Sequence, residues 1–311
     1  MRKLLTILFL ASIAVKAQTN YNIDTTYTPK SVYNKEIKKH PFISIAQRKH
    51  HANVLEKKEI VYSKINDREL HLDAYYTSQK NPAIVILHGG GWKSGNKSQM
   101  ETFAQEMASK GFSCFTIEYR LSQEAKYPAG IFDVKKAIQF IKINAKKFNA
   151  DTTKIAILGC SSGGQMAALI GSTNNNSIFE NNHASQKTTS NVQAIVDIDG
   201  ILAFKHPESE EGTTAGLWLG GSYEEKPEVW KQASALTYTD KNTPPTLFIN
   251  SSKKRFHAGR DDMITILNQH KIYNEVKTFG DAPHSFWFLN PWFDQTVNTT
   301  AQFLNKIFKI N

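Results

Sequence analysis

Cysteine is almost absent from this sequence, with only Cys114 and Cys160 among 311 residues. No cysteine follows the apolar N-terminal segment closely, which argues against lipoprotein processing. One of the two cysteines lies in a predicted strand and the other in a predicted turn. We expect both to be small buried residues rather than partners in a disulfide.

Signatures of several other protein classes are also missing. No Gly-Lys-Ser/Thr follows the glycine run at residues 89–91, and the glycine spacing of a dinucleotide-binding loop is absent, which excludes the common phosphate-binding loops. The formal net charge is +10, and much of the basic charge lies in residues 34–58, but no nucleic-acid-binding motif accompanies it. We interpret this charge as a solvated basic surface, with an acidic polysaccharide or another anionic surface as the alternative partner.

The first twenty residues, MRKLLTILFLASIAVKAQTN, have the pattern of a secretory signal peptide. Arg2 and Lys3 give a basic start, residues 4–15 are apolar, and Ala17 is one of the small residues that favour cleavage. Because the apolar segment is short for a membrane span, we expect cleavage after Ala17 and an exported protein, secreted or periplasmic, without stable membrane insertion. An uncleaved anchor is the competing interpretation.

The remaining sequence predicts one α/β domain. Two stretches on either side of Asn66 and Asp67 alternate polar and apolar residues and predict an antiparallel hairpin. Continuous apolar runs then alternate with stretches of helical spacing, which predicts a mostly parallel central sheet with helices on both faces. The expected strands lie at 83–87, 112–120, 155–158, 192–200, 246–252 and 275–280, and the expected helices at 99–110, 130–148, 261–270 and 294–308.

The predicted organisation has three parts. A signal peptide occupies residues 1–17, an N-terminal arm residues 18–58, and the α/β domain residues 59–311. Within that domain residues 201–243 have weak periodicity and many turn residues, and they predict a lid-like insertion over the strand ends. No internal repeat or low-complexity linker divides the chain further.

Residues 154–170, KIAILGCSSGGQMAALI, place two serines between a strand-like run and a helix-like run. The segment from Gly159 to Gly163 matches Gly-x-Ser-x-Gly, a sharp strand-to-helix turn that lifts one hydroxyl above the sheet. Ser161 is therefore the candidate nucleophile, and Ser162 fits less well because its own pentapeptide lacks the leading glycine. A plain glycine- and serine-rich turn is the alternative.

A serine nucleophile needs backbone donors for an oxyanion. The segment HGGGW at residues 88–92 supplies consecutive glycines after a strand, and these allow close approach of the main chain to a substrate. Gly90 and Gly91, together with the backbone N–H of Ser162, are the expected oxyanion donors. His88 is expected to brace this loop.

A serine nucleophile also needs a base that follows it in the chain. His284, in the turn GDAPHSFWF after the last expected strand, is the candidate base. His257 and His270 are weaker candidates, since the latter ends a helix, and His183 lies in a polar loop that predicts exposure to solvent.

At this point the sequence resembles the α/β-hydrolase superfamily, and within it the bifunctional feruloyl and acetyl xylan esterases of polysaccharide-degrading bacteria. The resemblance covers residues 59–310 and is carried by HGGGW, YRLSQEAKYPAGIFDVKKAIQFIKINAKKF, DTTKIAILGCSSGG, YTDKNTPPTLFIN and PHSFW, in that order. It implies the α/β-hydrolase fold, with active-site loops at the carboxyl ends of the strands and with the strands of Cys114 and Cys160 not adjacent. Together with the signal-peptide pattern, it implies an exported serine esterase that needs no metal or organic cofactor and removes chiefly acetyl groups, with feruloyl second, from plant-type polysaccharide.

Two positions depart from the pattern of this family. The residues that flank the serine, usually an acidic residue and an alanine, are Cys160 and Ser162, and this leaves the nucleophile geometry intact. The aspartate expected after the strand at 246–250 is missing, because lysines stand there. The nearest carboxylates belong to Asp261, Asp262, Asp197 and Asp199.

Asp261 is the expected triad acid, because it follows the loop that should face His284. An aspartate at the N-terminus of a helix has a common alternative role, which is to interact with free N–H groups. The basic stretch KKRFHAGR that contains residues 253–260 is also a candidate to bind a carboxylate of the substrate.

Aromatic side chains are the candidates for sugar binding, because rings stack on sugars. Trp92 and Trp218 are the main candidates, with Tyr223 and Phe286 beside them. The alternatives to a polysaccharide esterase are a non-catalytic carbohydrate-binding homologue, a general esterase of small esters and a peptidase.

Overall fold

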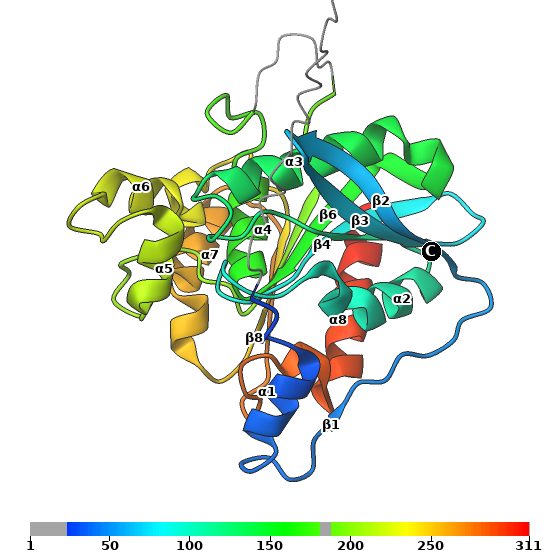
Figure 1. Ribbon diagram of the computed structural model, residues 1–311, viewed down its shortest axis with the longest axis horizontal. Coiled ribbons are helices and arrows are strands. Elements are labelled where there is room, and N and C mark those ends of the chain that lie inside the picture. Colours follow the sequence, from blue (N-terminus) through cyan, green and yellow to red (C-terminus); the bar gives the residue numbers. More distant parts are fainter. Residues whose placement is uncertain (1–23, 181–187, 311) are drawn as a thin grey trace, which may run out of the picture.

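A twisted sheet of eight strands forms the centre of the computed structural model, which describes residues 24–180 and 188–310 (Figure 1). The strand order is β2-β3-β5-β4-β6-β7-β8-β9. β3 pairs antiparallel with both of its neighbours, and every pair from β5 to β9 is parallel. The bounds are β2 Leu55–Ile65, β3 Arg68–Tyr76, β4 Asn81–Leu87, β5 Ser113–Ile117, β6 Ala150–Cys160, β7 Ala194–Ile198, β8 Thr246–Asn250 and β9 Asn274–Thr278.

Helices cover both faces of this sheet, which confirms the prediction from the alternating elements. Along β4 every residue is buried, and its side chains alternate between two separate hydrophobic cores. The helices α3, α4 and α7 pack in one core, and α2 and α8 pack in the other. Their bounds are α2 Glu101–Ser109, α3 Ala129–Ile143, α4 Ser162–Ser172, α7 Arg260–Gln269 and α8 Trp292–Phe308, with 3-10 turns η1 Lys97–Met100 and η2 Ala145–Phe148.

The two cysteines lie on strands that are not neighbours. β4 separates β5, which carries Cys114, from β6, which ends at Cys160. Both thiols are free and buried, and burial raises the pKa of each well above its ordinary value. The expectation of two small buried residues is confirmed.

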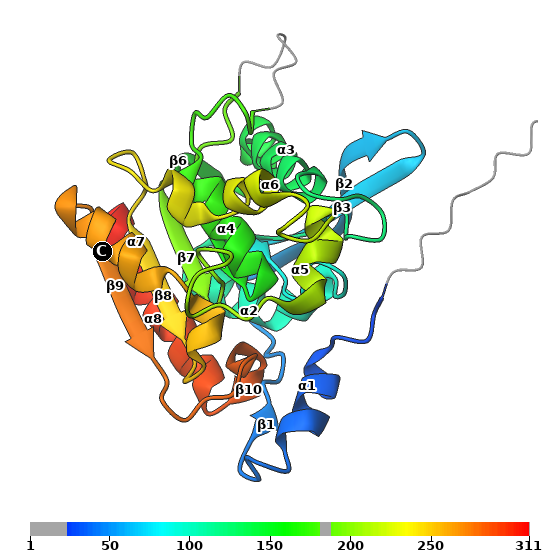
Figure 2. The same ribbon diagram turned by 90° about the vertical axis from the view of Figure 1, so that its left-hand side faces the viewer.

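The N-terminal arm packs against the domain. After Tyr27, the helix α1 (Pro29–Glu36) begins with a reciprocal capping box between Thr28 and Ser31. The short strand β1 (Ser44–Ile45) pairs with β10 (Leu289–Asn290), so that α1, β1 and β10 lie together at the lower end of Figure 2. The arm was expected to extend to residue 58, but β2 already begins at Leu55.

The insertion at residues 201–243 forms two short helices beside the strand ends, at the left of Figure 1. They are α5 (Gly212–Leu219) and α6 (Pro227–Gln232), followed by the turn η3 (Ala235–Tyr238). α5 ends at Gly220, which has a left-handed conformation. The 3-10 turns η4 (Lys254–His257) and η5 (Phe286–Phe288) follow β8 and β9.

The expected signal peptide at residues 1–17 lies outside the described residues. Within residues 24–180 and 188–310, each helix is too short or too polar to cross a lipid bilayer.

Candidate active site

Ser161 lies at the sharp turn between β6 and α4. Its backbone has φ 55° and ψ −122°, a strained conformation for a residue with a side chain. A Cβ on Gly159 would overlap the carbonyl oxygen of Gly163, and a Cβ on Gly163 would overlap that of His88. The two glycines are therefore required for this turn, as the pentapeptide predicted.

His284 lies within hydrogen-bond distance of Ser161. The distance from Ser161 Oγ to His284 Nε2 is 2.9 Å, and His284 comes from the loop between β9 and η5. The Phe256 ring stacks on the imidazole, with 3.4 Å between ring centroids, and Trp287 meets it edge-on at 5.2 Å. Of the candidate bases, His284 therefore lies at Ser161, and His257 and His270 do not. His183 lies outside the described residues.

Asp199 holds the other side of the imidazole. Its Oδ2 lies 2.9 Å from His284 Nδ1, and its Oδ1 accepts a hydrogen bond from the backbone N–H of Ser251 at 2.8 Å. The carboxylate is buried and follows directly after β7, where the backbone turns with φ 51°. Two hydrogen bonds therefore fix a buried carboxylate against the ring nitrogen that faces away from Ser161.

The expectation that Asp261 faces His284 is wrong. Asp261 lies in the first turn of α7 with its side chain 71% exposed, and its carboxylate pairs with Arg260 at 2.7 Å. Hydrogen bonding to Arg260 lowers the pKa of Asp261. Asp262 instead meets His206 at 3.1 Å. The first turn of α7 directs both carboxylates to the surface, so the acid comes from the end of β7.

Two of the three expected oxyanion donors lie at the cavity that contains the Ser161 hydroxyl. Gly91 and Ser162 line a cavity of about 250 Å³ with Ser161, whereas Gly90 does not line it. In the described part of the chain, the backbone N–H groups of Gly90, Gly91 and Ser162 have no hydrogen-bond acceptor. Gly91 adopts φ 61°, so the loop after β4 turns its main chain beside Ser161.

The insertion closes part of this cavity. Ile201, Glu211 and Thr214 line it, as do Arg255 and Phe256 from η4. Sequence reasoning did not find Phe256, although its neighbours in KKRFHAGR were noted as basic. A signal was present, because Phe256 lies only two positions after Lys254, where the family's aspartate is expected.

The tryptophans have different positions. Trp92 lines the cavity, donates its indole N–H to Gln165 at 3.0 Å, and stacks on Trp218 with 4.8 Å between ring centroids. Trp218 and Phe286 are buried in the cores, so the prediction that they contact substrate is wrong. Trp218 is buried because its ring packs behind the ring of Trp92.

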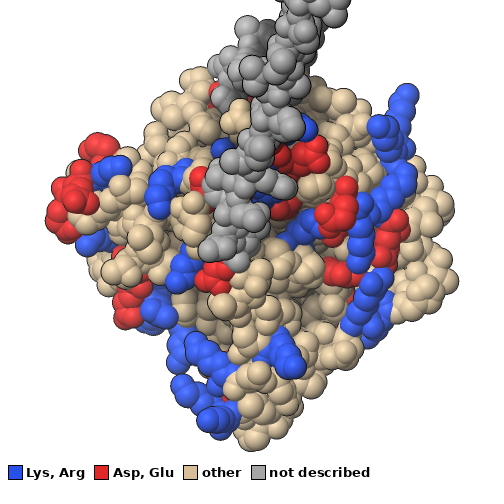
Figure 3. Space-filling view, in the orientation of Figure 1, with Lys and Arg blue, Asp and Glu red and all other residues tan. Residues whose placement is uncertain are grey.

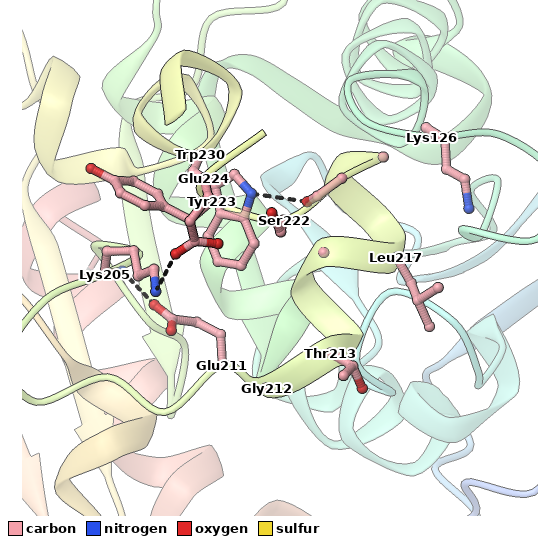
Figure 4. Close-up of a pocket in the computed structure, with 13 residues that line it drawn as sticks. Lys126, Lys205, Glu211, Gly212, Thr213, Leu217, Ser222, Tyr223, Glu224 and Trp230 are labelled. Carbon is pink, nitrogen blue, oxygen red and sulfur yellow. Dashed lines mark hydrogen bonds and ion pairs between the residues drawn. The ribbon is translucent and has the colours of Figure 1, made fainter. Parts of the chain in front are cut away.

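A larger cavity of about 740 Å³ lies against α5 and α6 (Figure 4). Tyr223 and Trp230 line it together with Leu217, and Glu211 is shared with the Ser161 cavity. Lys205 lies 3.8 Å from Glu224 and 5.1 Å from the centroid of the Tyr223 ring. Tyr223 is thus placed in this neighbouring cavity and not beside Ser161.

Two buried titratable groups support the loops of the site. Burial lowers the pKa of His88 to about 4, so its ring is neutral near pH 7, stacked on Tyr119 at 4.4 Å. Burial, with the nearby Asp199 charge, raises the pKa of Asp197 well above its ordinary value, and its Oδ1 accepts from the Gly200 N–H at 3.0 Å. Burial thus favours the neutral form of each side chain.

Within residues 24–180 and 188–310, no cluster of three or more His, Cys, Asp and Glu side chains is placed to hold a metal ion.

Comparison with known proteins places this site in a family. The family model described as BD-FAE matches residues 70–266, which is more than half of the chain. Among curated proteins, Esterase LipC of Mycobacterium tuberculosis is 28% identical over 245 residues, covering 73% of this chain and 59% of that protein. Esterase LipQ of the same organism is 26% identical, over 67% of this chain and 48% of that protein. The chain thus spans about half the length of these curated relatives.

Solved structures share the fold. A truncated carbohydrate esterase from gut microbiota superposes with a TM-score of 0.70 at 24% identity, covering 84% of this chain and 99% of that one. An acetyl ester-xyloside bifunctional hydrolase from Caldicellulosiruptor lactoaceticus gives 0.68 at 23% identity, with 79% and 91% covered. At these identities the likeness establishes the α/β-hydrolase fold, as the sequence predicted, and carries no statement about substrate.

Proposed function

The chain belongs to the BD-FAE family, and on that premise we propose that it is a serine esterase in which Ser161 attacks the carbonyl carbon of a carboxylic ester. The observation that carries the proposal is the continuous hydrogen-bonded chain from Ser161 through His284 to Asp199, with both contacts at 2.9 Å. The esterases named among its curated relatives support the same reaction class.

The proposed reaction uses His284 both in forming and in hydrolysing the acyl-enzyme. His284 Nε2 takes the proton of Ser161 as Oγ bonds to the ester carbon, and then returns it to the alcohol oxygen as the ester bond breaks. Water, activated by the same nitrogen, hydrolyses the acyl-enzyme. Asp199 is the positioning residue, because its carboxylate fixes the imidazole tautomer and stabilises the imidazolium.

The oxyanion is assigned to main-chain donors. The N–H groups of Gly90, Gly91 and Ser162 are free to bond the negative oxygen of the tetrahedral intermediate. Each such donor contributes about 2.7–4 kcal/mol to the stability of a transition state in enzymes of this type. The strained turn at Ser161 and the left-handed Gly91 bring the Gly91 and Ser162 donors to the cavity that contains the nucleophile.

The acyl group is proposed to be small, chiefly acetyl. The cavity beside Ser161 has about 250 Å³, which is below the usual range of about 300–1,000 Å³ for sites that enclose larger ligands. Trp92 and Ile201 give it an apolar wall. Feruloyl remains the second acyl group of the proposal, because of the family to which the chain belongs.

The alcohol is proposed to be part of an extracellular polysaccharide. The carbohydrate esterase and the acetyl ester-xyloside hydrolase that share the fold motivate this substrate class, and so does the signal-peptide pattern that ends at Ala17. Export by way of that segment, to the periplasm or the medium, is part of the proposal. A general esterase of small esters is the second candidate, supported by the names of the curated relatives.

The test is hydrolysis of p-nitrophenyl acetate and acetylated xylan by the wild type and by two variants. Ser161→Ala removes the nucleophile, and we expect kcat to fall by about 10⁴ or more. Ser162→Ala keeps the backbone N–H, so we expect it to retain most of the activity. Unchanged turnover in Ser161→Ala would exclude the proposed mechanism, and wild-type activity confined to long-chain acyl esters would exclude the polysaccharide.

A further inference from the structure

A second groove, with a volume of about 420 Å³, begins at His284 and runs along the N-terminal arm. Its walls are α1, the loop after β8 and the loop after β9. We call it the arm groove. Arg255 and Phe256 line both the arm groove and the Ser161 cavity, so these two side chains border both spaces.

Cations outnumber carboxylates in the arm groove. Its lining includes four lysine and arginine side chains and two carboxylates: Lys35, Lys39, Lys253, Arg255, Glu36 and Asp281. Both carboxylates are already engaged, because Glu36 lies 4.0 Å from Lys35 and 4.0 Å from His40, and Asp281 accepts from the indole of Trp292 at 3.1 Å. Figure 3 shows the blue side chains gathered over α1, with little red among them.

Two of the cations are unpaired. In residues 24–180 and 188–310, Lys39 and Lys253 have no carboxylate within ion-pair distance. Arg255 has a partial partner in Glu210 at 3.5 Å and keeps its side chain 46% exposed. Its guanidinium lies 4.4 Å from the centroid of the Phe256 ring, and this contact holds the planar donor fork at the mouth of the groove.

The position of His284 indicates which part of an ester substrate lies in the arm groove. In ester hydrolysis the imidazole returns its proton to the oxygen of the departing alcohol, so the alcohol must lie beside His284. His284 lines the arm groove, whereas Ser161, Ser162 and Gly91 line the other cavity. The acyl group is therefore expected in the Ser161 cavity, and the alcohol in the arm groove.

We infer that the arm groove is a subsite for a carboxylate carried by the alcohol part of the substrate, that is, for a uronate unit of an acidic polysaccharide, with Lys39, Lys253 and Arg255 as its binding cations. The inference rests on the proposed esterase function. A neutral sugar gains little from unpaired ammonium groups, whereas a carboxylate gains charge-assisted hydrogen bonds and the two-point geometry of the guanidinium.

The experiment compares two esters that differ in one group. Methyl O-acetyl-galactopyranoside and methyl O-acetyl-galactopyranosiduronate carry the same acetyl group at the same hydroxyl, and only the second has a carboxylate in place of the primary alcohol. For the wild type in about 20 mM salt we expect kcat/KM to favour the uronate by about tenfold, since each exposed ion pair contributes up to about fivefold. In about 0.5 M salt screening should remove most of this preference.

Neighbouring lysines provide a matched control. Lys39→Gln with Lys253→Gln removes two charges from the groove, and Lys38→Gln with Lys254→Gln removes two charges next to them in sequence but outside its lining. We expect the first pair to bring the ratio of kcat/KM values close to one and the second pair to keep the wild-type ratio. An equal loss in both pairs would assign the preference to the general basic field and overturn the subsite.

Two different kinetic results would overturn the subsite and the esterase activity. If the wild type hydrolyses both esters at the same rate in low salt, the subsite is overturned and the esterase stands. If it hydrolyses neither these esters nor p-nitrophenyl acetate, the esterase proposal fails and the subsite falls with it.

Discussion

At the scale of single residues, the orientation of His284 depends on a carboxylate that is buried and bonded twice. Asp199 accepts from the Ser251 N–H and lies against His284 Nδ1. Its side chain has no exposed surface, whereas that of His284 is 20% exposed. Because this carboxylate is buried, its loss should leave the imidazole without a partner that fixes its tautomer.

We expect Asp199→Asn to lower kcat by about 10⁴ while leaving KM almost unchanged. The amide keeps the acceptor for Ser251 but donates to the imidazole, which favours the wrong tautomer. Asp261→Asn is the matched control, because Asp261 is exposed and paired with Arg260, and its kcat should stay within about twofold. Steady-state kinetics with p-nitrophenyl acetate measures both. A larger loss in Asp261→Asn would contradict the assignment of Asp199.

The sequence predicted two members of this chain of residues and misplaced the third. Ser161 and His284 could be found because a glycine-flanked turn and a turn after the last strand are local patterns. The identity of the acidic residue depends on which of two adjacent strand ends faces His284. A local sequence pattern does not determine this. Asp199 was among the open alternatives, and its position directly after a buried strand was the available signal.

At the scale of elements, η4 holds the position where an aspartate was expected and provides an aromatic wall instead. Phe256 lies face to face with His284, with an interplanar angle of 11°, and Trp287 meets the same imidazole at 88°. During the reaction the imidazole becomes an imidazolium, and a ring face stabilises a cation. Phe256 is therefore a positioning residue for the catalytic histidine.

We expect Phe256→Leu to lower kcat by about two- to thirtyfold, which corresponds to the roughly 0.5–2 kcal/mol of a cation–ring contact. Phe256→Tyr keeps the ring and should restore the wild-type kcat. Both variants are assayed with p-nitrophenyl acetate, and Tm is recorded for each to separate packing from catalysis. Equal losses in Phe256→Leu and Phe256→Tyr would exclude the stacked ring as the cause.

Elements with strong periodicity could be predicted, and those held by tertiary contacts could not. The strands β4 to β8 and the helices α2, α3 and α8 agree with the apolar patterns of their segments. α1 has a single buried residue, Val32, and depends on its capping box and on contacts of the arm, such as Tyr27 with Ser285 at 2.7 Å. Such short helices gain most of their stability from packing, which the pattern of residues does not record.

At the scale of the whole molecule, buried polar side chains connect the interior of the protein to the active-site loops. His88 follows β4 and is buried. Its Nδ1 lies 2.8 Å from the carbonyl of Gly89, and its backbone carbonyl accepts from the Tyr119 hydroxyl at 2.7 Å. The loop that provides the oxyanion donors is thus anchored in the interior by a histidine that must stay neutral.

This histidine should make the folded state sensitive to acid. Burial lowers the pKa of His88 from 6.5 to about 4, so between these values the unfolded chain binds more protons than the folded one. Its contribution to the free energy of unfolding is therefore complete above pH 6.5 and is lost as the pH falls towards 4. From pH 7 to pH 4.5 the loss amounts to about 2 kcal/mol, at about 1.4 kcal/mol per unit of pKa shift.

Denaturant unfolding of the wild type, His88→Gln and Tyr119→Phe between pH 4.5 and pH 7.5 measures this loss. His88→Gln cannot titrate, so its free energy of unfolding should fall less steeply with acid than that of the wild type, by about 2 kcal/mol over the range. Tyr119→Phe removes a hydrogen bond worth about 1 kcal/mol but keeps the histidine and its ring partner, so its profile should run parallel to the wild type at lower stability. Parallel profiles for the wild type and His88→Gln would show that His88 does not determine the acid sensitivity of the fold.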